Sequence, residues 1–457
     1  MNSKQKHIHF IAIGGSAMHN LAIALHKKGY HISGSDDEIF EPSRGRLQKF
    51  GLLPEKFGWD AENIFSGLDA VILGMHAKND NPELLKAQKI GVKVYSYPEY
   101  LYEQTKNKIR IVIGGSHGKT TITSMFMHVL KHNNIPFDYM VGANLEGFET
   151  MVGLSEETKI AVFEGDEYLS SPIDRRPKFH LYRPHIALLT GIAWDHINVF
   201  PTFENYLQQF TEFVDFIEPG GTLAYFEGDK YLQEIVSKKT NLATKSYSTH
   251  KSIIKEQQTV LIADGNEIPL QVFGDHNLQN ISGAKEVCRQ VGISDEQFYN
   301  AITSFKGAGR RLQVLSENKD TIVFQDFAHS PSKLVATTRA VKNQFSKRKL
   351  VACMELHTFS SLKKEFLPQY QKCMEDADIA FVYYNPHTVE HKKMQPISKE
   401  LVFEAFAKEG LQVTTNSNEL FNELLALDWR DKNLLLMSSG NFDGKDLMEF
   451  SKRITNV

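Results

Sequence analysis

Gly114-Gly115-Ser116-His117-Gly118-Lys119-Thr120-Thr121 is the stretch of sequence that decides the fold of the central part of this chain. It follows an apolar run, Ile109 to Ile113, that is typical of a buried parallel strand. Apolar residues at helical spacing follow it, from Ile122 to Leu130. A strand, a glycine-rich turn, Lys-Thr and a helix predict a phosphate-binding loop, because small residues let backbone N–H groups approach phosphate oxygens at a helix N-terminus.

The loop differs from the usual phosphate loop in its spacing. Gly-x4-Gly-Lys-Thr would place a glycine at position 113, where the chain has Ile113, so the sequence predicts a variant P-loop with a shorter turn. We expect Lys119 to neutralise the β- and γ-phosphates of ATP and the Thr120 hydroxyl to hold Mg²⁺. The alternative is a glycine-rich turn with a surface lysine, which the flanking strand and helix disfavour. The loop residues predicted to bind ATP are Gly115, Ser116, His117, Gly118, Lys119, Thr120 and Thr121.

The bulk composition indicates a multidomain protein that acts on a small molecule. The chain has 457 residues, of which 41% are hydrophobic and 23% charged, and this length suggests two to four domains. The net charge is −3 without blocks of like charge, so we expect no nucleic-acid partner. No apolar run approaches the ~20 residues of a membrane span, and the polar start shows no signal peptide. Three scattered cysteines favour a reducing, cytoplasmic location.

Short apolar runs alternate with helical patterns, which predicts parallel sheets with crossover helices. The sequence suggests a hairpin around Asp264-Gly265 and a glycine-rich hinge at Gly307-Ala308-Gly309. We therefore predict three consecutive α/β domains. These are a Rossmann-like N-terminal domain at 1–106, a central P-loop ATPase-like domain at 107–311 and a Rossmann-like C-terminal domain at 312–457.

A second glycine turn, Gly14-Gly15-Ser16, lies between the first predicted strand and helix. A dinucleotide fingerprint would need glycines at positions 12, 14 and 17, but the chain has Ala12 and Ala17, which argues against NAD. The turn could still bind a pyrophosphate, and Asp36 is placed to contact a ribose or sugar hydroxyl. A purely structural turn remains the alternative.

Polar motifs end several other predicted strands. Glu164 is a hard oxygen ligand suited to nucleotide-bound Mg²⁺, although a solvated acidic turn is the plain alternative. His196, in Asp195-His196, is a less usual Mg²⁺ ligand and could equally be structural. Asn277 could be a helix N-cap, or could pair with a nucleotide base together with Asn280. Arg310-Arg311 could meet phosphate charge, and the segment Asp326 to Pro331 is typical of ribose and phosphate contacts.

Together these motifs resemble the Mur ligase family of bacterial cell-wall synthesis across nearly the whole chain. The resemblance rests on Gly115-Ser116-His117-Gly118-Lys119-Thr120-Thr121, Glu164-Gly165-Asp166-Glu167, Asp195-His196, His276-Asn277 with Asn280, Arg310-Arg311, and Asp326-Phe327-Ala328-His329 with Pro331. It implies that the first domain binds a UDP-sugar, the central domain ATP, and the last domain an amine. It further implies an ADP-forming ligase that joins a carboxylate to the amine through an acyl phosphate.

The resemblance also assigns roles to single residues. Lys119, Glu164, His196 and Arg311 are the implied catalytic residues, and Thr120, Glu164 and His196 the implied Mg²⁺ ligands. The implied ATP contacts outside the loop are Asn277, Asn280, Arg311, Asp326 and His329. The implied UDP-sugar contacts are Gly14, Gly15, Ser16, Ser35, Asp36 and Asn144.

Within the family, the chain is most similar to members that join UDP-N-acetylmuramate to L-alanyl-γ-D-glutamyl-meso-diaminopimelate in peptidoglycan recycling. Three stretches favour this branch: Gly34-Ser35-Asp36 with Phe40-Glu41-Pro42-Ser43, Glu164-Gly165-Asp166-Glu167-Tyr168, and Asp174-Arg175-Arg176-Pro177-Lys178-Phe179. The chain also lacks a lysine between His196 and Lys230, where several relatives that extend a peptide carry a carbamylated one. Glu355-Leu356-His357 departs from the Glu-Pro-Arg expected of the branch, and addition of L-alanine is the alternative. Rivals of other classes are an NAD(P)-dependent oxidoreductase and a non-catalytic nucleotide-gated protein.

Overall fold

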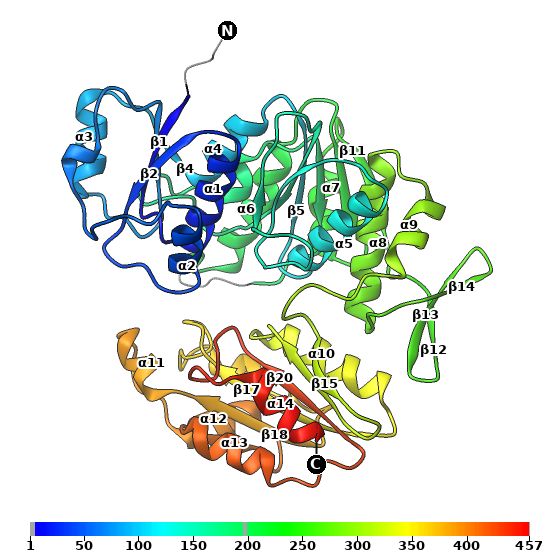
Figure 1. The fold of residues 1–457 in the computed structure, drawn as a ribbon. Helices are drawn as coiled ribbons and strands as arrows, with labels where there is room; N and C mark the ends of the chain where they lie inside the picture. The colour runs from blue at the N-terminus through cyan, green and yellow to red at the C-terminus, as the bar shows by residue number, and fades with distance from the viewer. Residues whose placement is uncertain (1–4, 195–198, 457) are drawn as a thin grey trace. The chain divides into compact units, whose positions relative to one another are not determined.

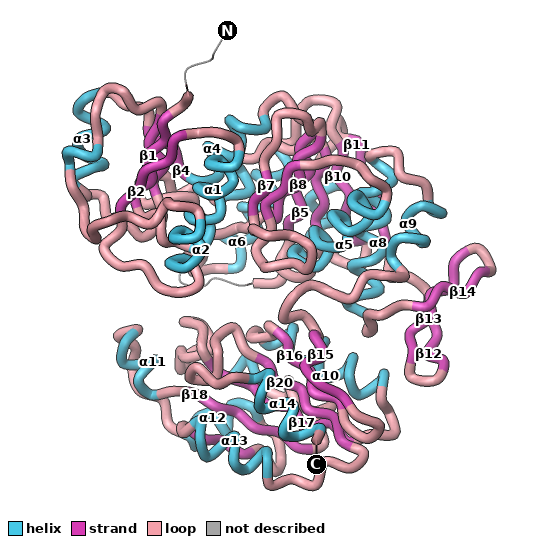
Figure 2. Tube along the Cα trace, viewed as in Figure 1, coloured by secondary structure: helices cyan, strands magenta, loops and turns pink. Residues whose placement is uncertain are grey.

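The computed structural model describes residues 5–194 and 199–456 (Figure 1). These residues form two compact units. The first contains residues 5–194, 202–248 and 283–298, and the second contains residues 199–201, 249–282 and 299–456. The first unit holds two sheets built largely from parallel strands, and the second holds an antiparallel ribbon and a third large sheet (Figure 2). This succession of α/β layers confirms the predicted fold class.

The N-terminal sheet is fully parallel, with the strand order β2-β1-β3-β4. The strands are β1 (His7–Ile11), β2 (His31–Ser35), β3 (Ala70–Leu73) and β4 (Val94–Ser96). The helices are α1 (Ser16–Lys27), α2 (Ser43–Lys49), α3 (Pro82–Ile90) and α4 (Tyr97–Thr105), with a short 3-10 helix, η1 (Ala61–Asn63). The chain passes from β1 to β2 on one side and then to β3 on the other side of β1. In open α/β sheets, ligands bind at the carboxyl ends of the strands where the strand order changes direction in this way, and the loop after β1 lies there.

The central sheet has the order β11-β10-β9-β5-β8-β6-β7, with β5 in the middle. Its strands are β5 (Ile109–Gly114), β6 (Asp138–Met140), β7 (Val152–Gly153), β8 (Ile160–Glu164), β9 (Ile186–Leu189), β10 (Thr222–Phe226) and β11 (Ala243–Tyr247). The helices are α5 (Lys119–His132), η2 (Lys178–Leu181), α6 (Phe203–Asp215), α7 (Lys230–Ser237), α8 (Asp275–Gln290) and α9 (Asp295–Ile302). Because β5 pairs in parallel with β8 and β9, its C-terminal loop lies between the ends of both neighbours.

Arg110 lies inside the apolar strand β5, where it is almost fully buried. Its guanidinium donates to the carbonyl oxygens of Tyr182 and Arg183 and forms an ion pair with Glu218 at 2.9 Å. A buried charge is tolerated when it is paired and hydrogen-bonded, so this residue does not interrupt the strand.

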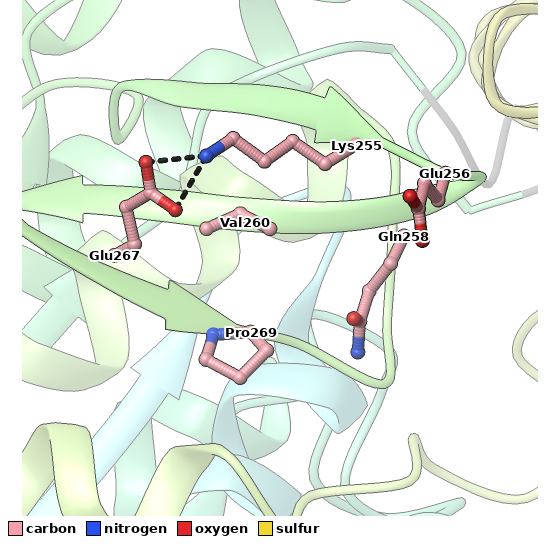
Figure 3. Close-up of a pocket in the computed structure, with 6 residues that line it drawn as sticks. All are labelled: Lys255, Glu256, Gln258, Val260, Glu267 and Pro269. Carbon is pink, nitrogen blue, oxygen red and sulfur yellow. Dashed lines mark hydrogen bonds and ion pairs between the residues drawn. The ribbon is translucent and has the colours of Figure 1, made fainter.

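The antiparallel ribbon of the second unit is formed by β12 (Ser252–Lys255), β13 (Gln258–Ala263) and β14 (Asn266–Pro269). Its β13–β14 turn contains the predicted Asp264-Gly265, and both residues have positive φ, as a type I′ turn requires. The strand β14 ends at Pro269, because proline has no N–H to extend the ladder. Figure 3 shows a pocket on this ribbon, where Lys255 bridges to both carboxylate oxygens of Glu267.

The C-terminal sheet has the order β15-β16-β20-β17-β18-β19, and β15 is antiparallel to its neighbour. Its strands are β15 (Gln313–Glu317), β16 (Ile322–Asp326), β17 (Lys349–Leu356), β18 (Ile379–Tyr384), β19 (Gln412–Thr414) and β20 (Lys432–Met437). The helices are α10 (Pro331–Gln344), η3 (Leu367–Tyr370), α11 (Pro386–His391), α12 (Lys399–Phe406), α13 (Ser417–Leu425) and α14 (Leu447–Thr455). Alternating strand residues pack into separate cores: Phe324 joins one face, and Val323 the other.

Among the residues that the structure describes, no helix has the length and apolarity needed to cross a bilayer. The three cysteines, Cys288, Cys353 and Cys373, are free and buried.

Candidate active site

The loop between β5 and α5 has the geometry of a phosphate-binding turn. Gly115 has φ +120° and Gly118, the residue that caps α5, has φ +75°. A Cβ atom on Gly115 would lie 2.1 Å from Oγ1 of Thr190, so glycine is required there for space as well as for backbone conformation. Thr190 in turn donates to the carbonyl oxygen of His117 at 2.5 Å. The loop is therefore held against the segment that follows β9.

Lys119 is the first residue of α5, and its ammonium group lies inside the loop. It donates to the carbonyl oxygen of Gly115 and to Oε2 of Glu167, each at 2.7 Å. Burial acts to lower the pKa of Lys119, but the negative charges of Glu167 and Asp166 outweigh it, and the net shift of the pKa is upward. The lysine is therefore held in its charged form, as neutralisation of phosphate requires.

Thr120 and Glu164 form a hydroxyl–carboxylate pair beside the loop. The Thr120 hydroxyl donates to Oε1 of Glu164 at 2.7 Å, and the backbone N–H of Gly142 donates to Oε2 at 2.7 Å. Both side chains offer hard oxygen atoms, which is the donor set that Mg²⁺ takes up beside nucleotide phosphates. No cluster of three or more His, Cys, Asp or Glu side chains suited to a metal ion occurs within residues 5–194 and 199–456. The pair fits Mg²⁺ that keeps water and phosphate ligands, rather than an all-protein metal cage.

The predicted third metal ligand, His196, lies outside the described residues, as does Asp195. The residues that precede them are anchored in the central domain. Ile192 donates its N–H to Asp229 at 2.7 Å, and Ala193 donates its N–H to the Ser116 hydroxyl at 2.8 Å.

The N-terminal loop is closed by Asp36. Oδ2 of Asp36 accepts the N–H of Gly14 at 2.7 Å, and Oδ1 accepts the N–H of Asp37 at 3.0 Å. Burial raises the pKa of Asp36 to about 6, although the hydrogen bond from Gly14 opposes the shift. The side chain thus braces the loop, and a Cβ on Gly14 would approach the carboxylate to 2.9 Å. The α1 N-terminus that follows has no side-chain cap at Gly15, which leaves its N–H groups available to an anion.

Ser35 lies beneath this loop and not on its exposed side. Its carbonyl oxygen accepts the N–H groups of Ala12 and Ile13, and its hydroxyl donates to Glu83. Glu83 is completely buried and also accepts hydrogen bonds from His9 and from the N–H of Asp60. The predicted direct contact of Ser35 with a UDP-sugar therefore has no support from the position of its side chain.

Asn144 of the central domain lies next to the N-terminal domain. Its Oδ1 accepts a hydrogen bond from Arg46 of α2 at 2.9 Å, and both side chains belong to the first unit. Arg46 also approaches Nε2 of His19 at 3.5 Å, and Asn20 accepts the N–H of Met151 at 2.9 Å. The sequence did not single out Arg46, His19 or Asn20, because only the packing of α1 and α2 brings them to Asn144.

The residues predicted around adenosine belong to the second unit. Asn277 lies inside α8, and its amide donates to the carbonyl oxygen of Phe273, so it is not an N-cap. Asn280 is buried one turn further along the helix. Burial lowers the pKa of the adjoining His276, while the charge of Asp326 raises it, so this group faces the end of β16.

Asp326, Arg311 and His329 gather at the end of β16. Asp326 accepts N–H groups from Leu312 and Ala328, each at 2.7 Å. The Arg311 guanidinium lies over the Phe327 ring at 4.5 Å, and His329 forms an edge contact with the same ring. The structure thus brings these predicted residues together within their own unit.

A further polar group lies where β17 and β20 end. The buried Glu355 carboxylate accepts hydrogen bonds from the Ser438 hydroxyl and from the N–H of Phe442. His357 lies 3.8 Å from Oε1 of Glu355 and is partly exposed. Burial lowers the pKa of His357, although the charge of Glu355 opposes this. In the sequence, Glu355 and His357 stand out only because Glu355-Leu356-His357 departs from the expected Glu-Pro-Arg.

The phosphate loop, its buried charged lysine and the adjoining hydroxyl–carboxylate pair define a nucleotide-binding enzyme of the P-loop class. Comparison with known families then places the chain more narrowly. Residues 7–109 match the family described as "Mur ligase family, catalytic domain", residues 113–288 match "Mur ligase middle domain", and residues 310–440 match "Mur ligase, glutamate ligase domain".

Similar curated proteins cover almost the same length. The chain is 32% identical to the UDP-N-acetylmuramate–L-alanine ligase of Lactobacillus helveticus over 84% of this chain and 85% of that protein. It is 29% identical to the enzyme of the same name from Carboxydothermus hydrogenoformans over 95% of this chain and 94% of that protein. The chain therefore belongs to the Mur ligase family, and it is an ATP-dependent, ADP-forming acid–amino-acid ligase.

Solved structures show the same fold. The murein peptide ligase of Psychrobacter arcticus is 22% identical, with a TM-score of 0.67 over 99% of both chains. The UDP-N-acetylmuramate–alanine ligase of Thermotoga maritima is 20% identical, with a TM-score of 0.72 over 98% of both chains. The MurF ligase of Thermotoga maritima, solved in complex with ADP, is 16% identical over 88% of this chain and 98% of that chain, with a TM-score of 0.63.

Proposed function

We propose that this ligase joins the carboxylate of UDP-N-acetylmuramate to the amino group of L-alanine in peptidoglycan synthesis. The observation that carries the proposal is the charged Lys119 beside the Thr120–Glu164 pair, because this arrangement can bring the anionic triphosphate and a carboxylate together. The curated relatives support the choice of substrates, since the enzymes from Lactobacillus helveticus and Carboxydothermus hydrogenoformans are named for them. A cytoplasmic location fits a reaction that consumes ATP.

The chemistry follows from the poor reactivity of a carboxylate. An oxygen of the lactyl carboxylate attacks the γ-phosphorus of ATP, a new O–P bond forms, and ADP leaves with the bridging oxygen. The amine nitrogen then attacks the acyl carbon of the acyl phosphate. The C–O bond to phosphate breaks, the amide C–N bond forms, and the nitrogen loses a proton. Phosphate is thus released in the step that makes the amide.

The central domain supplies the groups that lower the barrier of the first step. Lys119 holds a positive charge against the β- and γ-phosphates, where negative charge develops during transfer. Thr120 and Glu164, with the predicted His196, would hold Mg²⁺, which when bound neutralises phosphate oxygens. We propose that Asn277, Asn280 and Asp326 bind adenosine, and that Arg311 and His329 contact the nucleotide.

The N-terminal domain supplies the site for the UDP-sugar. We propose that the uncapped N-terminus of α1, at Gly15 and Ser16, binds the pyrophosphate. Gly14 and Asp36 shape the turn, and Ser35 supports it from below through its carbonyl oxygen. Asn144, which already contacts Arg46, lies on the side of the central domain that faces this turn within the first unit.

A second candidate amine is the tripeptide L-alanyl-γ-D-glutamyl-meso-diaminopimelate. The polar group at the ends of β17 and β20 favours it, because the partly exposed His357 offers a polar contact that the methyl side chain of L-alanine cannot use. The murein peptide ligase from Psychrobacter arcticus has the same fold. The first step of the reaction would be identical.

The test is phosphate release with ATP, Mg²⁺ and UDP-N-acetylmuramate, with L-alanine or the tripeptide added in separate reactions. Mass spectrometry of the nucleotide-sugar product identifies the amide. Turnover with L-alanine supports the proposal. Turnover with the tripeptide but not with L-alanine would show that the second candidate is the amine substrate. Lys119→Met serves as the control, since it removes the charge but keeps an apolar stem of similar length. If wild-type protein makes neither amide, the proposed function is wrong.

A further inference from the structure

Glu167 is a buried carboxylate whose two oxygens have separate partners. It is 1% exposed and lies just beyond β8, after Glu164. Oε2 forms an ion pair with the Lys119 ammonium at 2.7 Å, and Oε1 accepts the hydroxyl of Tyr206 at 2.9 Å. The two carboxylates that flank the turn therefore have different surroundings: Glu164 faces the Thr120 hydroxyl, and Glu167 faces the lysine.

Tyr206 extends this contact back to the phosphate loop. It lies on α6, is completely buried, and its hydroxyl is 3.0 Å from the Ser116 hydroxyl. Because Tyr206 donates its proton to Glu167, it must accept from Ser116. Ser116 in turn accepts the N–H of Ala193 at 2.8 Å. Each hydroxyl thus donates once and accepts once, and the chain of hydrogen bonds runs in one direction from Ala193 to Glu167.

The chain of hydrogen bonds fixes where the Lys119 ammonium can lie. An ammonium group has three N–H donors, and two of them bond to Gly115 and Glu167. Within residues 5–194 and 199–456 the third donor has no protein partner. Asp166, the other acid nearby, is held by Lys178 at 2.5 Å, so Glu167 is the carboxylate that bonds directly to Lys119.

We propose that Glu167 is a positioning residue that aims the Lys119 ammonium at the nucleotide, and that Tyr206 and Ser116 hold Glu167 in place. This proposal rests on the proposed function of the loop in ATP binding. Two lysine donors are committed to the protein, and the remaining one is directed to phosphate. Ser116 also ties the loop to the 190–193 segment through Ala193, so a shift of that segment changes the position of the lysine.

The test compares Glu167→Gln and Tyr206→Phe with wild type and with Glu204→Gln. Glu204 is an exposed residue of the same helix as Tyr206, and its variant is the matched control for loss of a carboxylate. Binding of Mg-ATP is measured by calorimetry without any sugar, and the KM for ATP and the KM for the UDP-sugar are measured separately in the full reaction. The melting temperature of each variant reports on folding.

We expect Glu167→Gln to weaken ATP binding about 10- to 100-fold, as expected for loss of one charged hydrogen bond. We also expect its KM for ATP to rise while its KM for the UDP-sugar stays unchanged, because Glu167 contacts Lys119 of the phosphate loop and not the N-terminal domain. Tyr206→Phe should weaken ATP binding about 3- to 10-fold, because the ion pair remains but is less well held.

Glu167→Gln with wild-type ATP affinity and a wild-type KM for ATP would overturn the proposal. Should Glu167→Gln fail to fold, wild-type ATP affinity in Tyr206→Phe would overturn it equally. A wild-type protein that binds ATP but makes no amide would refute the proposed function and leave this comparison intact, since calorimetry needs no second substrate.

Discussion

Gly115→Ala is the substitution that tests the geometry of the phosphate loop most severely. Gly115 has φ +120°, a region that alanine avoids at a cost of about 1–3 kcal/mol. The added Cβ would lie 2.1 Å from Oγ1 and 2.8 Å from the backbone nitrogen of Thr190, both far inside contact distance. Relief of such crowding by shifts of the backbone costs about another 1–3 kcal/mol.

Displacement of Thr190 also breaks its hydrogen bond to the carbonyl oxygen of His117, which contributes about 1 kcal/mol. We therefore expect Gly115→Ala to lower the free energy of unfolding by about 3–7 kcal/mol. ATP binding should be lost under conditions in which the variant is still folded, because the loop can no longer close on phosphate. Because the protein has several domains, the free energy of unfolding is taken from the urea transition of the first unit alone.

Gly91→Ala is the matched control. Gly91 ends α3 with φ +75°, and a Cβ on it would meet nothing within 4 Å. It should therefore cost only about 1 kcal/mol, which is the conformational term alone. Circular dichroism during urea unfolding measures both variants, and calorimetry measures Mg-ATP affinity. The reasoning fails if Gly115→Ala is no less stable than Gly91→Ala and binds ATP normally.

Three further predictions concern other parts of the site. Glu164→Gln should raise the Mg²⁺ concentration that gives half-maximal activity about 10-fold, since it removes one charged oxygen ligand; a metal titration that matches wild type would contradict the assignment. Asp36→Asn tests the buried carboxyl group, whose pKa is raised to about 6. The raised pKa makes the ionised form unfavourable in the folded state, so wild type should lose about 2 kcal/mol of stability as the pH rises from 4 to 7. The Asp36→Asn variant should not show this loss. Equal pH dependence of the two proteins in urea unfolding would show that Asp36 is not the cause. Arg46→Ala should raise KM for the UDP-sugar about 10-fold without a change in KM for ATP, because it frees Asn144; an equal rise in both constants would point to a general disturbance.

Local sequence patterns were sufficient for the phosphate loop. The strand, turn and helix from Ile109 to His132 are contiguous, and the residues that bend the chain are glycines with positive φ. The same holds for the Asp264-Gly265 turn, where neighbouring residues determine the structure. Segments of this kind can be predicted because the relevant interactions join residues close in sequence.

The supporting contacts could not be predicted in this way. Tyr206 and Ser116 are 90 positions apart, and Arg46 and Asn144 are 98 positions apart, so no local pattern connects them. Glu83 lies on α3 with an ordinary helical sequence, yet it is the buried acceptor beneath the N-terminal loop. The partner of Ser35 is equally distant in sequence, since its hydroxyl donates to Glu83 of α3, so its contact with a sugar stays a prediction.

The polar residues proposed to select the amine are far apart in the sequence. Glu355, Ser438 and Phe442 come together because β17 and β20 are neighbours in the sheet. Their sequence separation hides this polar group until the strand order is known.

The most direct test of the account follows oxygen atoms through the reaction. UDP-N-acetylmuramate labelled with ¹⁸O in its lactyl carboxylate is incubated with the enzyme, ATP, Mg²⁺ and the accepted amine, and the released phosphate is analysed by mass spectrometry. If the carboxylate attacks the γ-phosphorus, each phosphate released should carry one labelled oxygen, because the acyl C–O bond breaks in the second step. Phosphate without label, formed together with the amide, would contradict an acyl phosphate and with it the role assigned to Lys119 and Glu164.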